Sequence, residues 1–205
     1  MTIRIRDFKD DDFSQLADLL ARTWHTSQGE GAYWCGANEL AWHLTRSQRS
    51  MVAYEDDRIL GAALCEMAGA PTNERWEVEQ WQIAQIAWAQ DAVDSRAHEE
   101  FELDEDALMA EVNERLGTDA VGVLDLLIVT PDARGNGLGM RLLQDAIRWL
   151  EGEGADYLRL VTDDGCDWSL YEHLGMERVA SRRSGTGKES NVYCYQSSIE
   201  RLRGI

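Results

Sequence analysis

In the first third of the chain, some segments alternate apolar and polar residues as strands do, and another repeats apolar residues at the spacing of a helix. Residues 2–6 place isoleucine on one side and arginine on the other, which predicts a half-buried strand. Residues 13–20 carry apolar side chains at helical spacing, after three aspartates that suit the positive end of a helix. A short helix is then expected around residues 38–44, followed by strands over 50–54 and 58–67 with a polar turn between them.

The last third of the chain again alternates between strand and helix patterns. A continuous apolar run predicts a buried strand over residues 124–129. The elements expected after it are a helix to about residue 152, a strand over 156–161, a short helix over 164–174 that ends at Gly175, and a hairpin of 177–182 and 191–196 with its turn at 184–188.

Residues 69–118 interrupt this alternation. One helix is expected from a start signal at 71–73 to about residue 93, and a shorter one ends at Gly117. An acidic run over 99–106 separates them, and such a run is usually a solvated face or loop. The tryptophans of this segment are Trp76, Trp81 and Trp88. Because an inert surface helix would leave their apolar area exposed, we expect the segment to cover a binding site or to form a dimer face.

Composition favours a soluble enzyme and argues against several other classes. The 205 residues contain no apolar run near the roughly 18 residues of a membrane-spanning helix, and the N-terminal residues carry no secretory pattern. The four cysteines are scattered without a C-x-x-C pair, so we expect neither a metal site nor a disulfide framework, and a cytoplasmic, reduced protein. The formal net charge of −18 argues against nucleic acid as a partner. It suits a cationic substrate, or it serves solubility alone.

The strand over residues 124–129 leads into a turn that can bind an anion. After Pro131 come an arginine and three glycines at every second position, the last being Gly139. A glycine-rich turn that opens a helix presents backbone N–H groups and the positive helix end, which suit a pyrophosphate. The spacing excludes a P-loop, because no lysine lies near Gly139, and a dinucleotide fingerprint, whose third glycine would fall at Met140.

The pattern that remains is R-x-x-G-x-G over residues 134–139, preceded by V-x-P over 129–131. It resembles the coenzyme A-binding motif of the GNAT superfamily of N-acetyltransferases, and the order of the expected elements is similar to that family outside 69–118. The resemblance implies an α/β fold, with a mixed, mostly antiparallel central sheet of about seven strands that is splayed between the fourth and fifth and flanked by helices. We therefore expect residues 1–205 to form a single N-acetyltransferase domain with an acidic, tryptophan-containing helical insertion at about 69–118. The alternative is another anion-binding turn or a purely structural one.

The resemblance also indicates which residues bind coenzyme A. The backbones of Leu127, Ile128 and Val129 should pair with the pantetheine arm like an added strand. The backbone N–H groups that should hold the pyrophosphate belong to Arg134, Gly135, Asn136, Gly137, Leu138, Gly139 and Met140. Acetyl-CoA is then the co-substrate, and no metal is expected. Asp164 stands where many members carry an asparagine that touches the coenzyme, and we expect it to be a helix N-cap instead.

Two residues are candidates for proton transfer. Residues 168–176, W-S-L-Y-E-H-L-G-M, resemble the closing helix of the family, in which the tyrosine that matches Tyr171 lies near the coenzyme sulfur. A phenol is protonated at neutral pH and can donate to a thiolate, although a core aromatic residue is the plainer interpretation. Asp125 lies within an apolar strand and could accept the proton of an amine, or it could simply pair with an arginine. The histidines that are other candidates for the base, without a matching motif, are His25, His43, His98 and His173.

The expected function is transfer of an acetyl group from acetyl-CoA to the amine of a small molecule or peptide, by direct attack in a ternary complex. The alternatives are a non-catalytic acyl-CoA sensor and a transferase that uses another acyl donor. The aromatic residues that could form the acceptor pocket, or simply pack the core, are Trp24, His25, Tyr33, Trp34, Trp42, Tyr193 and Tyr195. We expect neither nucleic acid nor a membrane as a partner, and a homodimer is one possible assembly.

Overall fold

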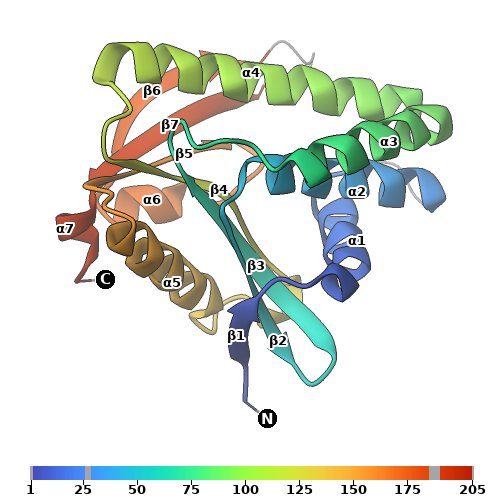
Figure 1. Ribbon diagram of the computed structural model, residues 1–205, viewed down its shortest axis with the longest axis horizontal. Coiled ribbons are helices and arrows are strands. Elements are labelled where there is room, and N and C mark those ends of the chain that lie inside the picture. Colours follow the sequence, from blue (N-terminus) through green and yellow to red (C-terminus); the bar gives the residue numbers. More distant parts are fainter. Residues whose placement is uncertain (1, 26–28, 185–189, 205) are drawn as a thin grey trace.

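The computed structural model describes residues 2–25, 29–184 and 190–204 (Figure 1). Its elements in chain order are β1 (Arg4–Asp7), α1 (Phe13–Trp24), α2 (Glu30–Arg46), β2 (Arg49–Glu55), β3 (Arg58–Met67), α3 (Glu74–Gln90), α4 (Ala92–Leu116), β4 (Val121–Val129), α5 (Leu138–Gly152), β5 (Tyr157–Asp163), α6 (Ser169–His173), β6 (Glu177–Arg183), β7 (Asn191–Ser198) and α7 (Ile199–Leu202). A short 3-10 turn, Asp10–Asp12, precedes α1. A second one, Pro131–Ala133, follows β4.

The described strands form one seven-stranded sheet in the order β1-β2-β3-β4-β5-β7-β6. Neighbouring strands are antiparallel except β4 and β5, which are parallel. This parallel pairing runs only from Val121–Leu124 on β4 to Tyr157–Leu160 on β5, whereas β4 stays paired with β3 as far as Val129. The ends of β4 and β5 therefore separate, and the expected mixed, splayed sheet flanked by helices is confirmed.

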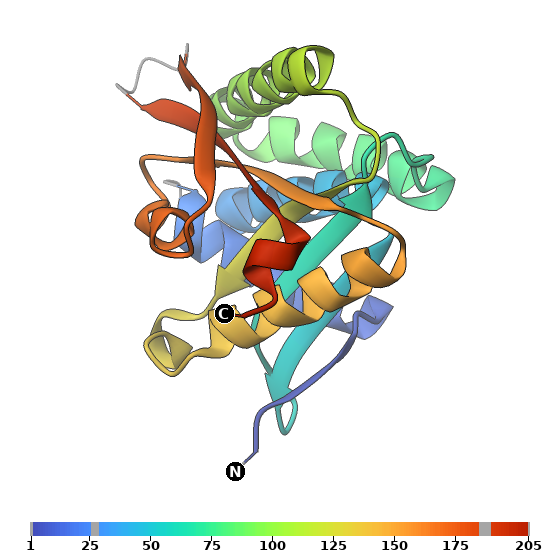
Figure 2. The same cartoon turned by 90° about the vertical axis from the view of Figure 1, so that its left-hand side faces the viewer.

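Helices cover both faces of this sheet, as the two ribbon views show (Figures 1 and 2). On one face α1 and α2 enclose a core that includes Leu16, Leu40 and Leu64. On the other face α5 packs Leu142 and Leu143 into a second core. The two N-terminal helices approach closely, because a Cβ on Gly36 would lie 2.4 Å from the carbonyl oxygen of Ala17, so only glycine fits there.

The segment predicted as an insertion forms the long helices α3 and α4. The expectation that the acidic run over 99–106 separates two helices is wrong, because the run lies inside α4. Of the two interpretations, a solvated face or a loop, the loop is excluded, and Glu99, Glu100 and Asp106 are exposed on the helix. The helix continues through the acidic run because an apolar stripe of Phe101, Leu108 and Val112 packs against the β6–β7 hairpin. Gly117 ends α4 with a φ of +79°, as expected.

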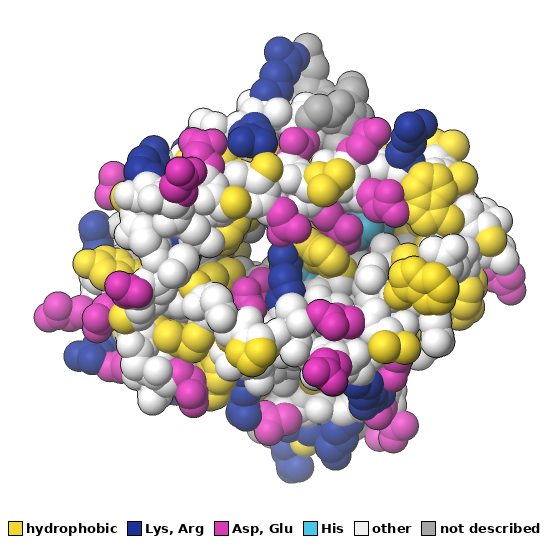
Figure 3. All heavy atoms as spheres, turned by 45° about the horizontal axis from the view of Figure 1, so that its top comes forward, with side chains coloured by type: hydrophobic (Ala, Val, Ile, Leu, Met, Phe, Trp, Pro, Cys, Tyr) yellow, Lys and Arg dark blue, Asp and Glu magenta, His cyan; other side chains and the backbone are white. Residues whose placement is uncertain are grey.

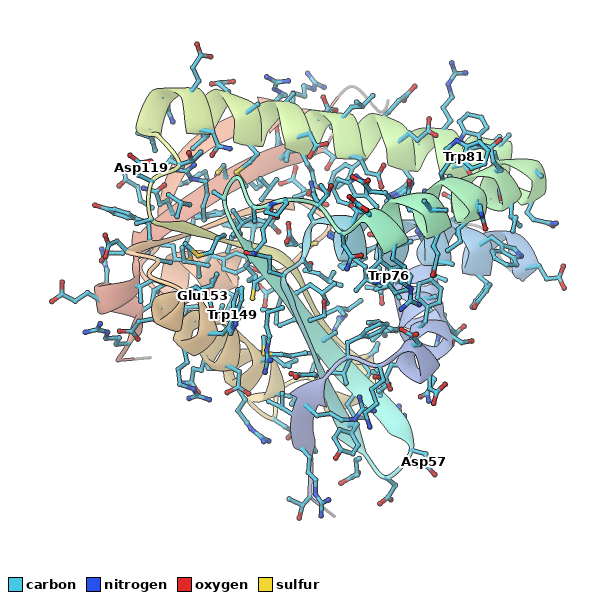
Figure 4. All side chains as sticks on the ribbon, viewed as in Figure 1. Asp57, Trp76, Trp81, Asp119, Trp149 and Glu153 are labelled. Carbon is cyan, nitrogen blue, oxygen red and sulfur yellow. The ribbon has the colours of Figure 1, made fainter. Side chains whose placement is uncertain are left out.

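The tryptophans of this segment do not share one environment (Figure 4). Trp76 is buried and stacks on Phe13 with ring centroids 5.4 Å apart, whereas Trp81 is 65% exposed. Trp88 is partly exposed and donates its indole N–H to Glu99. Of these three tryptophans, only Trp76 therefore packs into the core.

Other boundaries differ from the sequence-based expectations. The second helix, α2, begins at Glu30 and is much longer than expected, and α6 begins only at Ser169. The short α7 after the last strand was not predicted from the sequence pattern. Residues 185–188 of the expected hairpin turn lie outside the described residues. Among the described residues no helix is both long and apolar enough to pass through a membrane.

Candidate functional site

A cleft of about 1170 Å³ opens where β4 and β5 separate. One half is lined by the end of β4, the glycine turn, the start of α5 and residues of α6. The other half is lined by α1, α2 and α4. We call the first of them the turn half and the second the helix half of the cleft. Acidic side chains are spread over the molecular face that carries α3 and α4, which is hollowed near its middle (Figure 3).

The glycine turn leaves backbone N–H groups without helical partners. Gly137 has a left-handed φ of +73° and is the N-cap of α5, with no side chain capping the helix. The first N–H groups of any helix lack intrahelical acceptors, so those of Leu138, Gly139 and Met140 point toward the approach to α5. A Cβ on Gly135 or Gly137 would meet no atom within 4 Å, so the space beside the turn is open. Backbone amides, a helix N-terminus and open space together suit a phosphate group.

The residues expected to bind coenzyme A nearly all line the turn half of the cleft. Those found there are Leu127, Ile128, Val129, Arg134, Gly135, Gly137, Leu138, Gly139 and Met140. Asn136 is the one expected residue that does not line it. Arg134 donates from Nε to the carbonyl oxygen of Val129 at 3.1 Å, which ties the turn to the end of β4.

Tyr171 lies on α6 in the turn half and is buried. Its ring packs against Tyr195 with centroids 5.8 Å apart. Burial raises the pKa of the Tyr171 hydroxyl above its ordinary value, because a phenolate would lose hydration there. The hydroxyl is therefore protonated at neutral pH and can act as a hydrogen-bond donor.

Asp125 lies on β4 beside the point where the strands separate, and its side chain is only 3% exposed. Ser47 donates to its carboxylate at 3.5 Å, and Arg46 Nη2 lies 3.7 Å from its Oδ1. Burial raises the pKa of Asp125 to about 6, and the charge of Arg46 opposes that rise. Burial and the charge of Asp125 also raise the pKa of the adjacent Glu66. Asp125 is thus both loosely paired with an arginine and placed on the cleft, so the two interpretations of the sequence coexist.

The helix half contains part of the expected aromatic set. Trp24, His25 and Trp42 line it. The expected residues that pack in the cores instead are Tyr33, Trp34, Tyr193 and Tyr195. One face of Trp42 is covered by the guanidinium of Arg46, 3.5 Å from the ring centroid. Trp42 therefore already makes a cation–π contact within the chain.

The sequence led us to expect that residues 69–118 cover a binding site or form a dimer face, but it identified only His98 among the α4 side chains that line the helix half. Asp94, His98 and Glu105 of that helix all line the cleft. Burial raises the pKa of Glu105 to about 8, so its carboxyl group is largely protonated at neutral pH. The available signal was the helical spacing of Phe101, Glu105, Leu108 and Val112, which puts a carboxylate within an apolar stripe.

His25 and His98 are the two histidines of the cleft with carboxylate partners. His25 lies 3.0 Å from Glu39 through Nε2 and 3.0 Å from Asp94 through Nδ1. His98 Nε2 lies 2.7 Å from Glu102 Oε1, and this pairing outweighs burial to raise the pKa of His98 to about 9. The two imidazole rings face each other with centroids 5.3 Å apart.

The other residues singled out in the sequence, two histidines and Asp164, lie in environments that do not indicate a role in catalysis. Burial lowers the pKa of His43 well below its ordinary value, so the ring is neutral. His173 is exposed, and its Nδ1 lies 2.7 Å from the carbonyl oxygen of Ser169. The expectation that Asp164 caps a helix is wrong, because its carboxylate accepts from the Asn191 backbone and the Tyr193 hydroxyl, holding the β5–β7 edge.

Comparisons with known proteins agree with this fold. The model of the acetyltransferase (GNAT) family matches residues 13–176. The ribosomal-protein-S18-alanine N-acetyltransferase from Escherichia coli is similar with a TM-score of 0.59 and 14% identity, over 97% of this chain and 94% of that one. An aminoglycoside 6'-N-acetyltransferase complexed with coenzyme A is similar with a TM-score of 0.58 and 16% identity, over 96% and 97% of the two chains.

A third solved structure, Ard1 from Thermoplasma volcanium, is similar with a TM-score of 0.56 and 13% identity, over 97% of this chain and 98% of that one. Identities this low show the fold alone. Comparison with curated proteins by sequence finds no match. The family model covers most of the chain, including β4, the glycine turn and Tyr171. The chain belongs to the acetyltransferase (GNAT) family.

Proposed function

We propose that this protein transfers the acetyl group of acetyl-CoA to an amine by direct attack in a ternary complex. One observation carries the proposal: the glycine turn, the end of β4 that has no partner on β5, and Tyr171 line the same half of one cleft. A pyrophosphate site and a proton donor are thus joined by a strand edge along which an extended ligand arm can pair.

The residues of the turn half fit coenzyme A. The first N–H groups of α5 and the open space beside Gly137 suit its pyrophosphate. The backbone of Leu127, Ile128 and Val129 has no partner on β5 and suits the amides of pantetheine. An N–H group of that stretch would also polarise the acetyl carbonyl.

Proton transfers in the reaction fall to two side chains. Asp125 accepts the proton of the acceptor ammonium, directly or through water, so that a neutral amine attacks the thioester carbonyl carbon. As the carbon–sulfur bond breaks, Tyr171 donates its hydroxyl proton to the leaving thiolate. These roles suit a carboxylate whose pKa lies nearer neutrality than usual and a hydroxyl that stays protonated.

The acceptor is expected to enter from the helix half, as the amine of a small molecule or of a peptide. The solved structures with this fold include enzymes named for an alanine of a ribosomal protein and for an aminoglycoside, so both kinds of amine occur among them. The net charge of −18 favours a cationic acceptor of either kind.

The test is release of free thiol from acetyl-CoA across a panel of amines, with acetylated products identified by mass spectrometry. Tyr171→Phe should lower kcat by roughly 100-fold or more, because the thiolate then lacks its proton donor. The matched control is Tyr157→Phe, at an exposed tyrosine of β5 away from the cleft, which should leave kcat unchanged. Coenzyme binding without turnover on any amine, or wild-type kcat in Tyr171→Phe, would overturn the proposal.

A further inference from the structure

Three side chains from separate elements converge in the helix half of the cleft. His25 follows α1, Glu39 lies on α2 and His98 lies on α4. One donor atom from each lies within 4.8 Å of the other two, and all three side chains line the cleft. They are nearly buried, with exposed side-chain fractions of 4%, 11% and 9%. Two imidazoles and a carboxylate are therefore close enough to share one ion.

Each imidazole of this group also contacts a further carboxylate through one ring nitrogen. Asp94 Oδ2 lies 3.0 Å from His25 Nδ1, and Glu102 Oε1 lies 2.7 Å from His98 Nε2. The His25 contact is a hydrogen bond, and metal-binding histidines are commonly held in this way, because the carboxylate accepts the N–H of the nitrogen that does not bind the metal. The close His98 contact does not have hydrogen-bond geometry. On His25 the bond to Asp94 leaves Nε2, the atom 3.0 Å from Glu39 Oε2, to face the group.

The contact between His25 Nε2 and Glu39 is favourable only if a proton or a metal ion lies between the two atoms. A neutral imidazole has one N–H, so if Nδ1 donates it to Asp94, a nitrogen lone pair and a carboxylate oxygen face each other at 3.0 Å. Either a second proton on the ring or a metal ion between the two atoms removes that repulsion. A tetrahedral ion with bonds of about 2.0–2.1 Å to nitrogen and oxygen holds such atoms at a comparable separation.

We propose that His25, Glu39 and His98 form a binding site for a divalent transition metal of the zinc type. Two imidazole nitrogens and one carboxylate oxygen are a ligand set that zinc takes when a fourth position stays open, whereas magnesium and calcium prefer oxygen ligands alone. The open position faces the helix half of the cleft, where it would take water or a nitrogen or oxygen atom of a ligand. The site uses neither the residues expected to bind coenzyme A nor Asp125 and Tyr171, the two side chains to which the proposed function assigns proton transfer.

A second grouping shares His25 and must be separated from this one. Possible ligand atoms of His25, Cys35 and Asp94, one from each, also lie within 4.8 Å of one another. Cys35 is 1% exposed, contacts Ser95 Oγ at 3.6 Å and does not line the cleft. The group with Glu39 and His98 is favoured because it is the one that a ligand in the cleft can reach.

The experiment titrates the metal-depleted full chain with zinc chloride in a calorimeter and, separately, with Co²⁺ followed by visible absorption. The wild type should bind one equivalent of Zn²⁺ and give the intense absorption of four-coordinate Co²⁺. His25→Ala and His98→Ala should each weaken binding by about 100-fold or more, and Asp94→Asn by roughly 10-fold or more. Cys35→Ser and His173→Ala should bind as the wild type does.

Three results would overturn the metal site: no stoichiometric binding by the wild type, wild-type affinity in both histidine variants, or loss of binding in Cys35→Ser. Where His25→Ala lowers the melting temperature, the more conservative Glu39→Gln replaces it in the same titration. A thermal shift with acetyl-CoA, measured on the same metal-depleted samples, tests the proposed function separately. The two proposals can therefore fail independently.

Discussion

At the scale of single residues, Asp125 shows what a sequence indicates and what it leaves out. The sequence shows that Asp125 lies within an apolar strand. Burying an unpaired carboxylate there is costly in free energy, so the residue is expected to have a partner or a function. Its partners, Ser47 and Arg46 from the end of α2 and Glu66 from β3, come from other parts of the chain. These partners and the burial set its pKa, and no local pattern reports them.

The pKa of Asp125 predicts how activity depends on pH. A general base must be ionised, so kcat/KM should rise with pH through about 6, the value to which burial raises this carboxyl group. Asp125→Asn should remove that rise and lower kcat/KM roughly 100-fold at neutral pH, because the amide cannot accept the proton. The measurement is a pH profile of thiol release for both proteins with one amine.

The matched control for this substitution is Asp119→Asn, at an exposed aspartate in the loop between α4 and β4 (Figure 4). It makes the same chemical change away from the cleft and should keep the wild-type profile. An Asp125→Asn profile with the same rise near pH 6 would show that another group is the base.

At the scale of elements, local signals decided what could be predicted. The unit of β4, the glycine turn and α5 was predictable because an apolar run, a proline and glycines follow one another within 20 residues of sequence. The acidic part of α4 was not, because charged residues have the same pattern in a solvated loop and on a helix that faces a cleft. What keeps it helical is packing on β6 and β7, a contact between distant segments.

The glycine turn supports a prediction about the coenzyme. Acetyl-CoA should raise the melting temperature of the wild type, since a ligand that binds only the folded state stabilises it. Gly137→Glu should abolish this shift, because a carboxylate would occupy the open space where the pyrophosphate is expected. Differential scanning fluorimetry with and without acetyl-CoA measures both effects.

Gly154→Glu is the matched control for that variant. Gly154 also has a positive φ, +92°, and open space around it, but it lies beyond the other end of α5. Glutamate at either position carries similar backbone strain, about 1 kcal/mol, so both variants should lose similar stability without ligand. Only Gly137→Glu should lose the response to acetyl-CoA, and an equal response in both would place the pyrophosphate elsewhere.

At the scale of the whole molecule, the cleft combines segments that the sequence alone could not bring together. The turn half follows from one continuous motif, and nearly all of its expected residues were found there. The helix half depends on α1, α2 and α4 meeting across the separated strands, so residues such as Glu105 and Glu39 gave no sign of sharing one site. Its carboxylates add a local negative field to a chain whose net charge is −18.

This field predicts opposite salt effects for the two substrates. Raising the ionic strength from about 0.01 M to about 0.15 M shortens the screening length from roughly 30 Å to roughly 8 Å, so long-range interactions with the charge of −18 fade. For a cationic acceptor, kcat/KM should then fall by a few-fold, because attraction into the cleft is lost. For acetyl-CoA, an anion repelled by the same field, kcat/KM should rise or stay constant. Initial rates at limiting concentrations of each substrate measure the two effects, with NaCl and KCl compared to exclude specific ions. A fall of equal size for both substrates would mean that salt acts on the enzyme itself and that the charge serves solubility alone.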